Sequence, residues 1–246
     1  MPPAAEERRA GGLARIVFIT GLGLTALVCA GLGIWQLQRL SWKLDLIARV
    51  EQRLVAPPVA APGPAAWGRT VAADEYRRVV LQGHYPDVPE TLTKAVTERG
   101  PGFWVLAPFQ ADGGFTVLVN RGFVPEGRHG AEERRRIAGP STVSGLLRLT
   151  EPDGGFLRRN DPAARRWYSR DVAAIAQAQG FGQVAPYFID ADAATEPGPL
   201  PQGGMTQVAF RNAHLVYALT WFCLALMSAG AVVYLARHGA DEAPEA

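Results

Sequence analysis

The chain has 246 residues, 48% of them hydrophobic and 20% charged, which is the composition of an ordinary folded protein and not of a disordered one. Its formal net charge is +2, because 25 Lys and Arg stand against 23 Asp and Glu. A chain so evenly balanced lacks the basic excess typical of nucleic-acid binding, so we expect no nucleic acid as a partner.

Two long runs without an ionisable side chain lie near the two ends of the chain. The first covers the 23 residues 16–38 and the second the 22 residues 215–236. About 20 apolar residues, at ~1.5 Å per residue, cross the ~30 Å hydrocarbon core of a bilayer. We therefore predict one transmembrane helix over 16–38 and another over 212–236.

The first run resembles a signal peptide in part, since three arginines precede it and Val28-Cys29-Ala30 looks like a small-residue cleavage site. Its apolar stretch is longer than a signal peptide requires and continues past that tripeptide. We interpret it as an uncleaved anchor.

The same run carries Gly21, Gly23 and Ala26 in the spacing of a dinucleotide-binding turn, with Asp45 at a suitable distance beyond. That site needs a second strand ending at the acid, whereas Asp45 lies in "WKLDLIARVEQRL", whose apolar residues recur at helical spacing. We favour a role for the small residues in the close approach of another transmembrane helix.

The two cysteines, Cys29 and Cys223, both lie in the apolar runs, so residues 39–211 contain no disulfide and no thiol. Buried cysteines usually pack as small apolar residues, and a paired copper or redox role is the alternative.

Residues 39–211 form a domain between the spans, with connectors rich in proline and glycine at 56–64 and 196–204. Inside them, "GFTVLVN" alternates apolar and polar positions as a strand does. The turn "ADGG" before it is short enough for a hairpin with "GFWVLAPF". We predict a mainly antiparallel sheet.

A helix interrupts the strand pattern at "WYSRDVAAIAQAQG". Ser169 or Asp171 can cap its start, and Gly180 can end it. The expected fold class is therefore a membrane protein with two transmembrane helices flanking an α+β, mainly antiparallel-sheet extramembrane domain.

The domain contains none of the familiar catalytic spacings, so we expect no enzyme. One stretch, "VLVNRGFVP", places Asn120, Arg121 and Gly122 at the predicted end of a strand. Such a group suits a carboxylate or a phosphate. The alternative is that Asn120 closes the turn and Arg121 pairs with a carboxylate of the domain itself.

The domain side of the membrane gathers polar and aromatic residues from both helices. His214, Tyr217 and Trp221 follow one another at i, i+3 and i+7, so they share a helix face. The first helix repeats that spacing with Trp35, Gln38 and Trp42.

Interfacial aromatic belts and an Asn212 cap account for part of this pattern. An imidazole between aromatic rings, with Arg39 and Arg211 near the propionates, would also suit a haem iron. The residues alone leave haem, copper, quinone and a helix cap open.

Four segments resemble one known family. They are "GLGIWQLQRLSWKLDLI", "VLVNRGFVP", "RRWYSRDVAAIA" and "GGMTQVAFRNAHLVYALTWFCLA", and they follow one another along nearly the whole chain. They are similar to the surfeit locus protein 1 family, the cytochrome c oxidase assembly factors. The chain departs from that family at Ala213, where a second asparagine often precedes the histidine.

The resemblance implies an assembly factor that binds haem a at the membrane surface and aids its insertion into subunit I of the oxidase. It implies His214 as the iron (metal) ligand and Trp221 as a wall of the pocket. The expected cofactor-binding residues are His214, Tyr217, Trp221, Trp35, Arg39 and Arg211. The expected partners are oxidase subunit I, haem a synthase and membrane lipid. A cofactor-free scaffold for oxidase subunits or haem a synthase is the alternative.

Two spans place the tails, 1–15 and 237–246, on one side of the membrane and residues 39–211 on the other. The distribution of Lys and Arg around the spans does not decide which side is which. The resemblance implies the outer face of an energy-transducing membrane. The short segment before the first span and the Ala-, Arg- and Pro-rich composition favour a bacterium. We expect the inner membrane, with cytoplasmic tails and a periplasmic domain.

Overall fold

A computed structural model describes residues 4–69, 74–155, 157–195, 199–206 and 212–238. The chain divides into two compact units. One combines Met1–Ala48 with Ala209–Ala246, and the other is Arg49–Val208.

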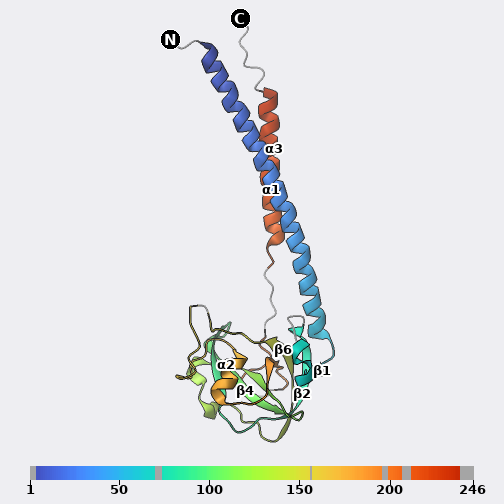
Figure 1. Cartoon of the computed structure of the whole chain (residues 1–246), viewed down its shortest axis with the longest axis vertical. Coiled ribbons are helices and arrows are strands. Elements are labelled where there is room, and N and C mark those ends of the chain that lie inside the picture. The colour runs from blue at the N-terminus through green and yellow to red at the C-terminus, as the bar shows by residue number, and fades with distance from the viewer. Residues whose placement is uncertain (1–3, 70–73, 156, 196–198, 207–211, 239–246) are drawn as a thin grey trace. The chain divides into compact units, whose positions relative to one another are not determined.

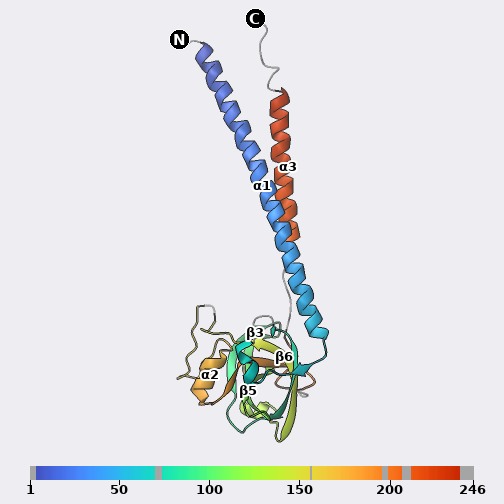
Figure 2. The same cartoon turned by 45° about the vertical axis from the view of Figure 1, so that its right-hand side comes forward.

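The first unit contains helix α1 (Ala4–Val55) as far as residue 48 and helix α3 (His214–His238), and these two helices lie side by side (Figures 1 and 2). Both are long and apolar enough to cross a membrane, with mean hydropathies of 2.1 and 1.9 in an 18-residue window. Most of their large apolar side chains are exposed, for example Leu27 at 71% and Leu226 at 73%. Apolar surface of this extent requires lipid around it, as expected of a membrane protein.

Helix α1 extends 17 residues beyond the predicted span that ends at residue 38. The extension continues because Leu40, Ile47, Val50 and Leu54 maintain a helical apolar repeat with no glycine or proline to end it. The helix stops only before the paired prolines Pro57 and Pro58.

The second unit is built on a seven-stranded sheet. Its elements are β1 (Val59–Ala60), η1 (Pro64–Arg69), β2 (Arg78–His84), β3 (Thr91–Thr97), β4 (Gly100–Ala111), β5 (Thr116–Pro125), η3 (Glu126–Arg128), η4 (Ala131–Glu133), β6 (Pro140–Leu149), α2 (Val172–Gln179) and β7 (Val184–Ala191).

The strand order is β1-β2-β6-β7-β5-β4-β3, and β2 also pairs with β4 through Gly83 and His84. This additional pairing closes β2, β6, β7, β5 and β4 into a barrel, with β1 and β3 as outer strands. The sheet is antiparallel except for the β1–β2 and β5–β7 pairs, so the predicted mainly antiparallel α+β domain is confirmed.

The predicted hairpin and helix are also confirmed. Strands β4 and β5 join through the "ADGG" turn, in which Gly114 N–H donates to the Ala111 carbonyl at 3.0 Å. Helix α2 begins after Asp171, whose Oδ1 accepts from Ala174 N–H at 3.1 Å. It ends at Gly180, whose φ of 68° is the left-handed conformation that glycine adopts without strain.

The core lies on both sides of β5, and for this reason nearly all of its residues are buried. Inside the barrel, Phe109, Val117 and Tyr187 belong to the largest cluster. Between the sheet and α2, Leu118 and Ile175 belong to a second cluster.

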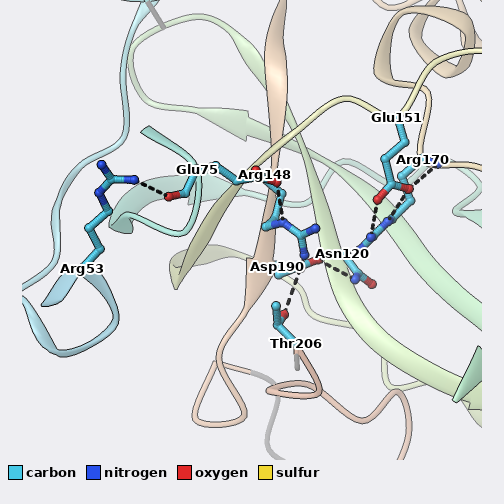
Figure 3. Close-up of polar contacts among 8 residues, drawn as sticks. All are labelled: Arg53, Glu75, Asn120, Arg148, Glu151, Arg170, Asp190 and Thr206. Atoms are coloured by element: carbon cyan, nitrogen blue, oxygen red, sulfur yellow. Dashed lines mark hydrogen bonds and ion pairs between the residues drawn. The ribbon is translucent and has the colours of Figure 1, made fainter. Parts of the chain in front are cut away.

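A buried carboxylate, Asp190 on β7, joins distant parts of the domain (Figure 3). Its Oδ1 accepts from Asn120 Nδ2 at 2.7 Å and from an Arg170 guanidinium nitrogen at 3.2 Å. Its Oδ2 accepts from Arg148 at 2.9 Å and from the Thr206 hydroxyl at 2.8 Å. Two guanidinium groups and two neutral donors thus compensate one carboxylate that is only 4% exposed.

The network continues to the end of α1. Arg148 Nε also donates to the Glu75 carboxylate at 3.3 Å, and Arg53 donates to the Glu75 carbonyl at 3.3 Å (Figure 3). Burial on its own lowers the pKa of Arg148, but Asp190 and Glu75 outweigh it and raise that pKa. The segments next to both membrane helices, at Arg53 and Thr206, are therefore tied to one network inside the domain.

We predict that Asp190→Asn destabilises the domain by about 3–5 kcal/mol, because it leaves two buried guanidinium groups without their shared carboxylate. Thermal unfolding of the detergent-solubilised chain, followed by tryptophan fluorescence, measures the loss. The exposed Asp112→Asn is the matched control and should change stability by less than about 0.5 kcal/mol. An Asp190→Asn protein as stable as the control would contradict the role of the network.

A second prediction concerns the stability of the domain at low pH. Burial raises the pKa of Glu151, but its hydrogen bonds with Arg170 and the charge of that residue lower it overall. A lowered folded pKa stabilises the fold above the unfolded carboxyl value of about 4.3, and this contribution disappears as the pH falls through the folded pKa. Melting temperatures measured from pH 6 to pH 3 should fall less steeply for Glu151→Gln than for the exposed Glu98→Gln. Parallel curves would refute the contribution.

Candidate functional site

The seam between α1 and α3 is built from small residues. On α1, Cys29 and Gly33 are buried, and on α3, Ala218 and Ala225 are buried at 1% and 8% exposure. A side chain on Gly33 would meet the Phe222 ring, since its Cβ would lie 2.7 Å from a ring carbon. Small residues let two membrane helices approach closely, as the glycine and alanine pattern of the first run predicted.

Two hydrogen bonds fix the register of the antiparallel pair. Arg15 donates to the Leu235 carbonyl at 2.6 Å, and Gln36 Oε1 lies 2.8 Å from His214 Nδ1. The two bonds are 21 residues apart on each helix, which corresponds to about 31 Å of rise. That length is the thickness of a hydrocarbon core, so the seam carries a polar contact at each membrane surface.

The Gln36 bond determines which ring nitrogen of His214 carries the proton. An amide oxygen only accepts, so Nδ1 is the donor, and in the neutral ring Nε2 then keeps its lone pair. Among the described residues, none bonds to Nε2. A neutral imidazole held in this tautomer by a neighbouring acceptor is the usual form of a histidine metal ligand. Nε2 is thus the atom of the first residue of α3 that could hold a metal ion.

Asn212 caps the same helix end, because its Oδ1 accepts from His214 N–H at 3.3 Å. The helix-cap interpretation of this segment is therefore confirmed for Asn212. His214 itself bonds through its side chain to the other helix and is half-buried.

Aromatic residues line one side of the seam next to His214. The Arg39 guanidinium lies 5.8 Å from the Trp35 ring centroid and 5.6 Å from that of Trp42. At about 100° per residue, these three side chains lie roughly 60–120° around α1 from Gln36. Trp35 and Trp42 are 48% and 54% exposed.

The aromatic residues of α3 next to His214 face the same side of the helix pair as those of α1. Tyr217 lies roughly 60° and Trp221 roughly 20° around α3 from His214. Because the two helices are antiparallel, successive residues turn in opposite senses when both helices are viewed from the same end. These rotations therefore bring Tyr217 and Trp221 to the side on which the aromatic residues of α1 lie. Tyr217 is 56% exposed and Trp221 is half-buried. His214, Tyr217, Trp221, Trp35 and Arg39 thus lie on one side of the helix pair, over about 15 Å of its length.

The predicted site residues differ in how the structure places them. Five of them lie on one side of the helix pair, and their part in binding a cofactor stays a prediction. Arg211, the sixth, lies outside the described residues. Gln38, which belonged to the spacing expected on the first helix, is exposed, and the partner of His214 is Gln36. The sequence carried a signal for Gln36, which continues the seam spacing of Cys29 and Gly33.

The two cysteines do not form a pair. Cys29 is buried in the seam, whereas Cys223 is exposed. Nine residues after His214, Cys223 has turned about 180° around α3 and faces away from α1. The structure therefore contradicts a shared copper or redox role and supports ordinary packing for Cys29.

The number of side chains that could bind a metal ion together with His214 limits the kind of metal centre that suits this residue. Within the described ranges, no group of three or more His, Cys, Asp or Glu side chains lies close enough to hold a metal ion. A protein-bound zinc ion needs three or four such ligands. A haem iron needs one or two, because the macrocycle supplies four nitrogens, and the single His214 fits that need.

The stretch "VLVNRGFVP" does not contain the strand end and turn that the sequence predicted. Asn120, Arg121 and Gly122 lie inside β5 and not at its end. Arg121 pairs with Glu90, so the interpretation that it bonds to a carboxylate of the domain is confirmed. Asn120 bonds to Asp190 and also accepts from Gly122 N–H at 3.2 Å.

Comparison with known proteins gives a consistent match. The model of the SURF1 family matches residues 23–226. Surfeit locus protein 1 of Mus musculus is 39% identical over 213 residues, covering 79% of this chain and 67% of its own length. The Homo sapiens protein of the same name is 38% identical over 214 residues, with 79% and 69% covered.

A match in Monosiga brevicollis covers more of both chains. The SURF1-like protein of Monosiga brevicollis is 34% identical over 253 residues, covering 97% of this chain and 93% of its own length. The matched segment extends across both units, so the likeness includes the two helices as well as the domain.

We predict that Gly33→Leu loosens the helix pair by about 1–3 kcal/mol, because the new side chain overlaps the Phe222 ring. Unfolding by sodium dodecyl sulfate, followed by circular dichroism, measures the change. Gly31→Leu is the matched control, since its Cβ has nothing within 4 Å. Adding Phe222→Ala to Gly33→Leu should recover part of the loss. Equal effects at positions 33 and 31 would show that the seam is packed differently.

Proposed function

Because the chain belongs to the SURF1 family, we propose that it is an assembly factor for haem-copper cytochrome c oxidase. It binds haem a at the membrane surface and aids insertion of haem a into oxidase subunit I. The observation that carries this proposal is the His214 imidazole, whose Nδ1 proton Gln36 accepts while Nε2 keeps its lone pair at the end of the seam.

The aromatic side of the helix pair next to His214 suits a flat, largely apolar macrocycle. Trp35 and Tyr217 offer aromatic faces near the level of the membrane surface, Trp221 offers another about 10 Å deeper, and aromatic pairs stack favourably. Arg39 provides a cation near that surface, where the haem carboxylates would meet water. Arg211 is proposed for the same role.

The bound haem supplies the iron, and the residues of this chain hold it. Gln36 retains the proton on Nδ1 of His214, so the ligand stays neutral and correctly turned. The exposed apolar side chains on this side of the helix pair exclude water when lipid covers them. The protein thus acts by binding and transfer and not by catalysis.

The proposed location is a bacterial inner membrane with the domain in the periplasm. Oxidase subunit I and haem a synthase are the proposed protein partners, and membrane lipid surrounds α1 and α3. The 31 Å between the two polar contacts of the seam supports a position across the bilayer, with Gln36 and His214 at the domain side.

Purification from cells that make haem a tests the proposal. The wild-type chain should carry haem a in its absorption spectrum, and His214→Ala should lower the haem content at least about tenfold, since the iron loses its ligand. His238→Ala is the matched control, because His238 lies at the other end of α3. Equal haem content in all three proteins would remove His214 as the ligand.

Two substitutions of Gln36 provide a second test, which compares haem binding with and without an acceptor for the Nδ1 proton of His214. Gln36→Leu removes the acceptor of the Nδ1 proton and should weaken haem binding about tenfold, whereas Gln36→Glu retains an acceptor and should bind as well as wild type. Identical binding by the Leu and Glu variants would show that the hydrogen bond does not prepare the ligand.

A cofactor-free scaffold is the second candidate, and the outer face of α1 favours it. Gly21 has no atom within 4 Å of the position of a Cβ, so a partner helix could approach closely there. This function predicts haem-free protein that still co-purifies with oxidase subunits, and loss of that association in Gly21→Leu but not in His214→Ala.

A further inference from the structure

A cavity of about 430 Å³ lies between the start of β3, the end of α2 and the segment that leads into α2. Its walls are mostly apolar, and the residues that form them are Val88, Pro89, Leu92, Trp167, Ala178 and Phe181. The volume falls within the ~300–1,000 Å³ of ordinary ligand sites. The cavity therefore has room for a compact apolar body, such as an aromatic ring with a short alkyl chain.

Hydrogen bonds hold these walls together. The Lys94 N–H at the outer edge of β3 donates to the Trp167 carbonyl at 2.9 Å. The Gln179 amide at the end of α2 donates to the Thr91 hydroxyl of β3. Trp167 is itself only 5% exposed, so its ring is a fixed wall. The three segments around the cavity are therefore tied to one another, and the space between them is part of the fold.

One cation, Arg165, lines the cavity from a tight turn. Asp161 and Arg166 close this turn, since each donates its backbone N–H to the carbonyl of the other, at 2.8 and 2.9 Å. Arg165 N–H donates to the Pro162 carbonyl at 3.1 Å, and its φ of 52° is left-handed. A residue other than glycine keeps that conformation only where the surrounding structure holds it there. The backbone of Arg165 is therefore fixed beside the cavity.

The charge of Arg165 is not balanced within the described part of the chain, where this side chain forms no ion pair and no hydrogen bond. Glu90 is the other ionisable residue of the lining. Both of its carboxylate oxygens are occupied, since Arg121 donates to Oε1 and Arg134 donates to Oε2. Neither of these two arginines lines this cavity. Glu90 is thus neutralised from outside, and Arg165 is the uncompensated charge among the described lining residues.

We propose that this cavity binds a small amphipathic acid. The apolar body of the ligand fills the space beside Trp167, and its carboxylate lies against the exposed guanidinium of Arg165 at the rim. A guanidinium matches a carboxylate with two parallel hydrogen bonds. The apolar body contributes because its surface leaves water on binding. Only a molecule with both parts uses both features of the site.

The edge of β3 favours a free small molecule over a segment of another protein. A polypeptide that adds to a sheet edge needs strand N–H and carbonyl groups with which to pair. Beside the cavity, the Lys94 N–H is already bonded to the Trp167 carbonyl. The site lies wholly within the domain, so the proposal does not rest on haem binding.

Isothermal titration calorimetry of the full chain in detergent tests the site, with 4-phenylbutyrate as the probe. Titration of the probe into protein-free micelles gives the background to subtract. The chain should bind one molecule of the probe. 4-Phenylbutyramide has the same body without the charge and should bind about tenfold more weakly, because the charge-assisted hydrogen bonds are lost. Butyrate, which lacks the ring, should also bind at least about tenfold more weakly.

Variants of the chain locate the site. Arg165→Gln should weaken binding of 4-phenylbutyrate about tenfold and leave binding of the amide unchanged. Arg159→Gln is its control, because Arg159 is an exposed arginine that does not line the cavity. Ala178→Phe fills the cavity and should abolish binding of both ligands. Its control is Ala173→Phe, since Ala173 is an exposed alanine of α2 outside the lining.

Three results would overturn the proposal. The acid and its amide bind the wild-type chain equally, or Arg165→Gln and Ala178→Phe bind like their controls, or a capped Phe-Glu dipeptide binds at least about tenfold more tightly than 4-phenylbutyrate. The last result would make the site one for a protein segment. His214→Ala should bind the probe as wild type does. Failure of this site is thus distinguishable from failure of haem binding, which is read from the absorption spectrum.

Discussion

A bilayer offers no water to a polar side chain, and this constraint decides how α1 and α3 meet. The seam between them is made of small residues, with hydrogen bonds between the helices at Arg15–Leu235 and at Gln36–His214. Inside the span, Thr25 and Thr220 bond to carbonyls of their own helices at 2.9 Å. The polar pair at the domain side therefore lies at a membrane surface, where an imidazole meets both lipid and water.

The domain depends on a different polar centre, the Asp190 carboxylate. Because it collects donors from β5, β6, the segment before α2 and Thr206, its loss would affect strands that are distant in sequence. Arg148 and Arg170 also lie over the Phe188 ring, at 5.9 and 4.7 Å from its centroid, so the charged network packs against the apolar core. Closure of the barrel between β2 and β4 stabilises this packing.

Local sequence patterns predicted the helices and the hairpin, but they did not predict which distant strands pair. Hydropathy located both membrane helices, the "ADGG" turn predicted the β4–β5 hairpin, and the Asp171 and Gly180 signals predicted α2. Neither the parallel β5–β7 pair nor the β2–β4 closure could be predicted, because each joins strands that lie far apart in the sequence. In the site, helical spacing grouped His214 with Tyr217 and Trp221. Gln36 continues the helical spacing of Cys29 and Gly33, but it was missed because only the register of α1 against α3 places it beside His214.

We propose that His214 supplies the protein ligand to haem iron. The chain has four histidines, so the direct measurement uses a variant in which His84, His129 and His238 are all alanine. Its absorption spectrum after purification from cells that make haem a should match that of the wild type in band position and in haem content per chain. Loss of the haem from this variant, with the fold intact by circular dichroism, would contradict the account.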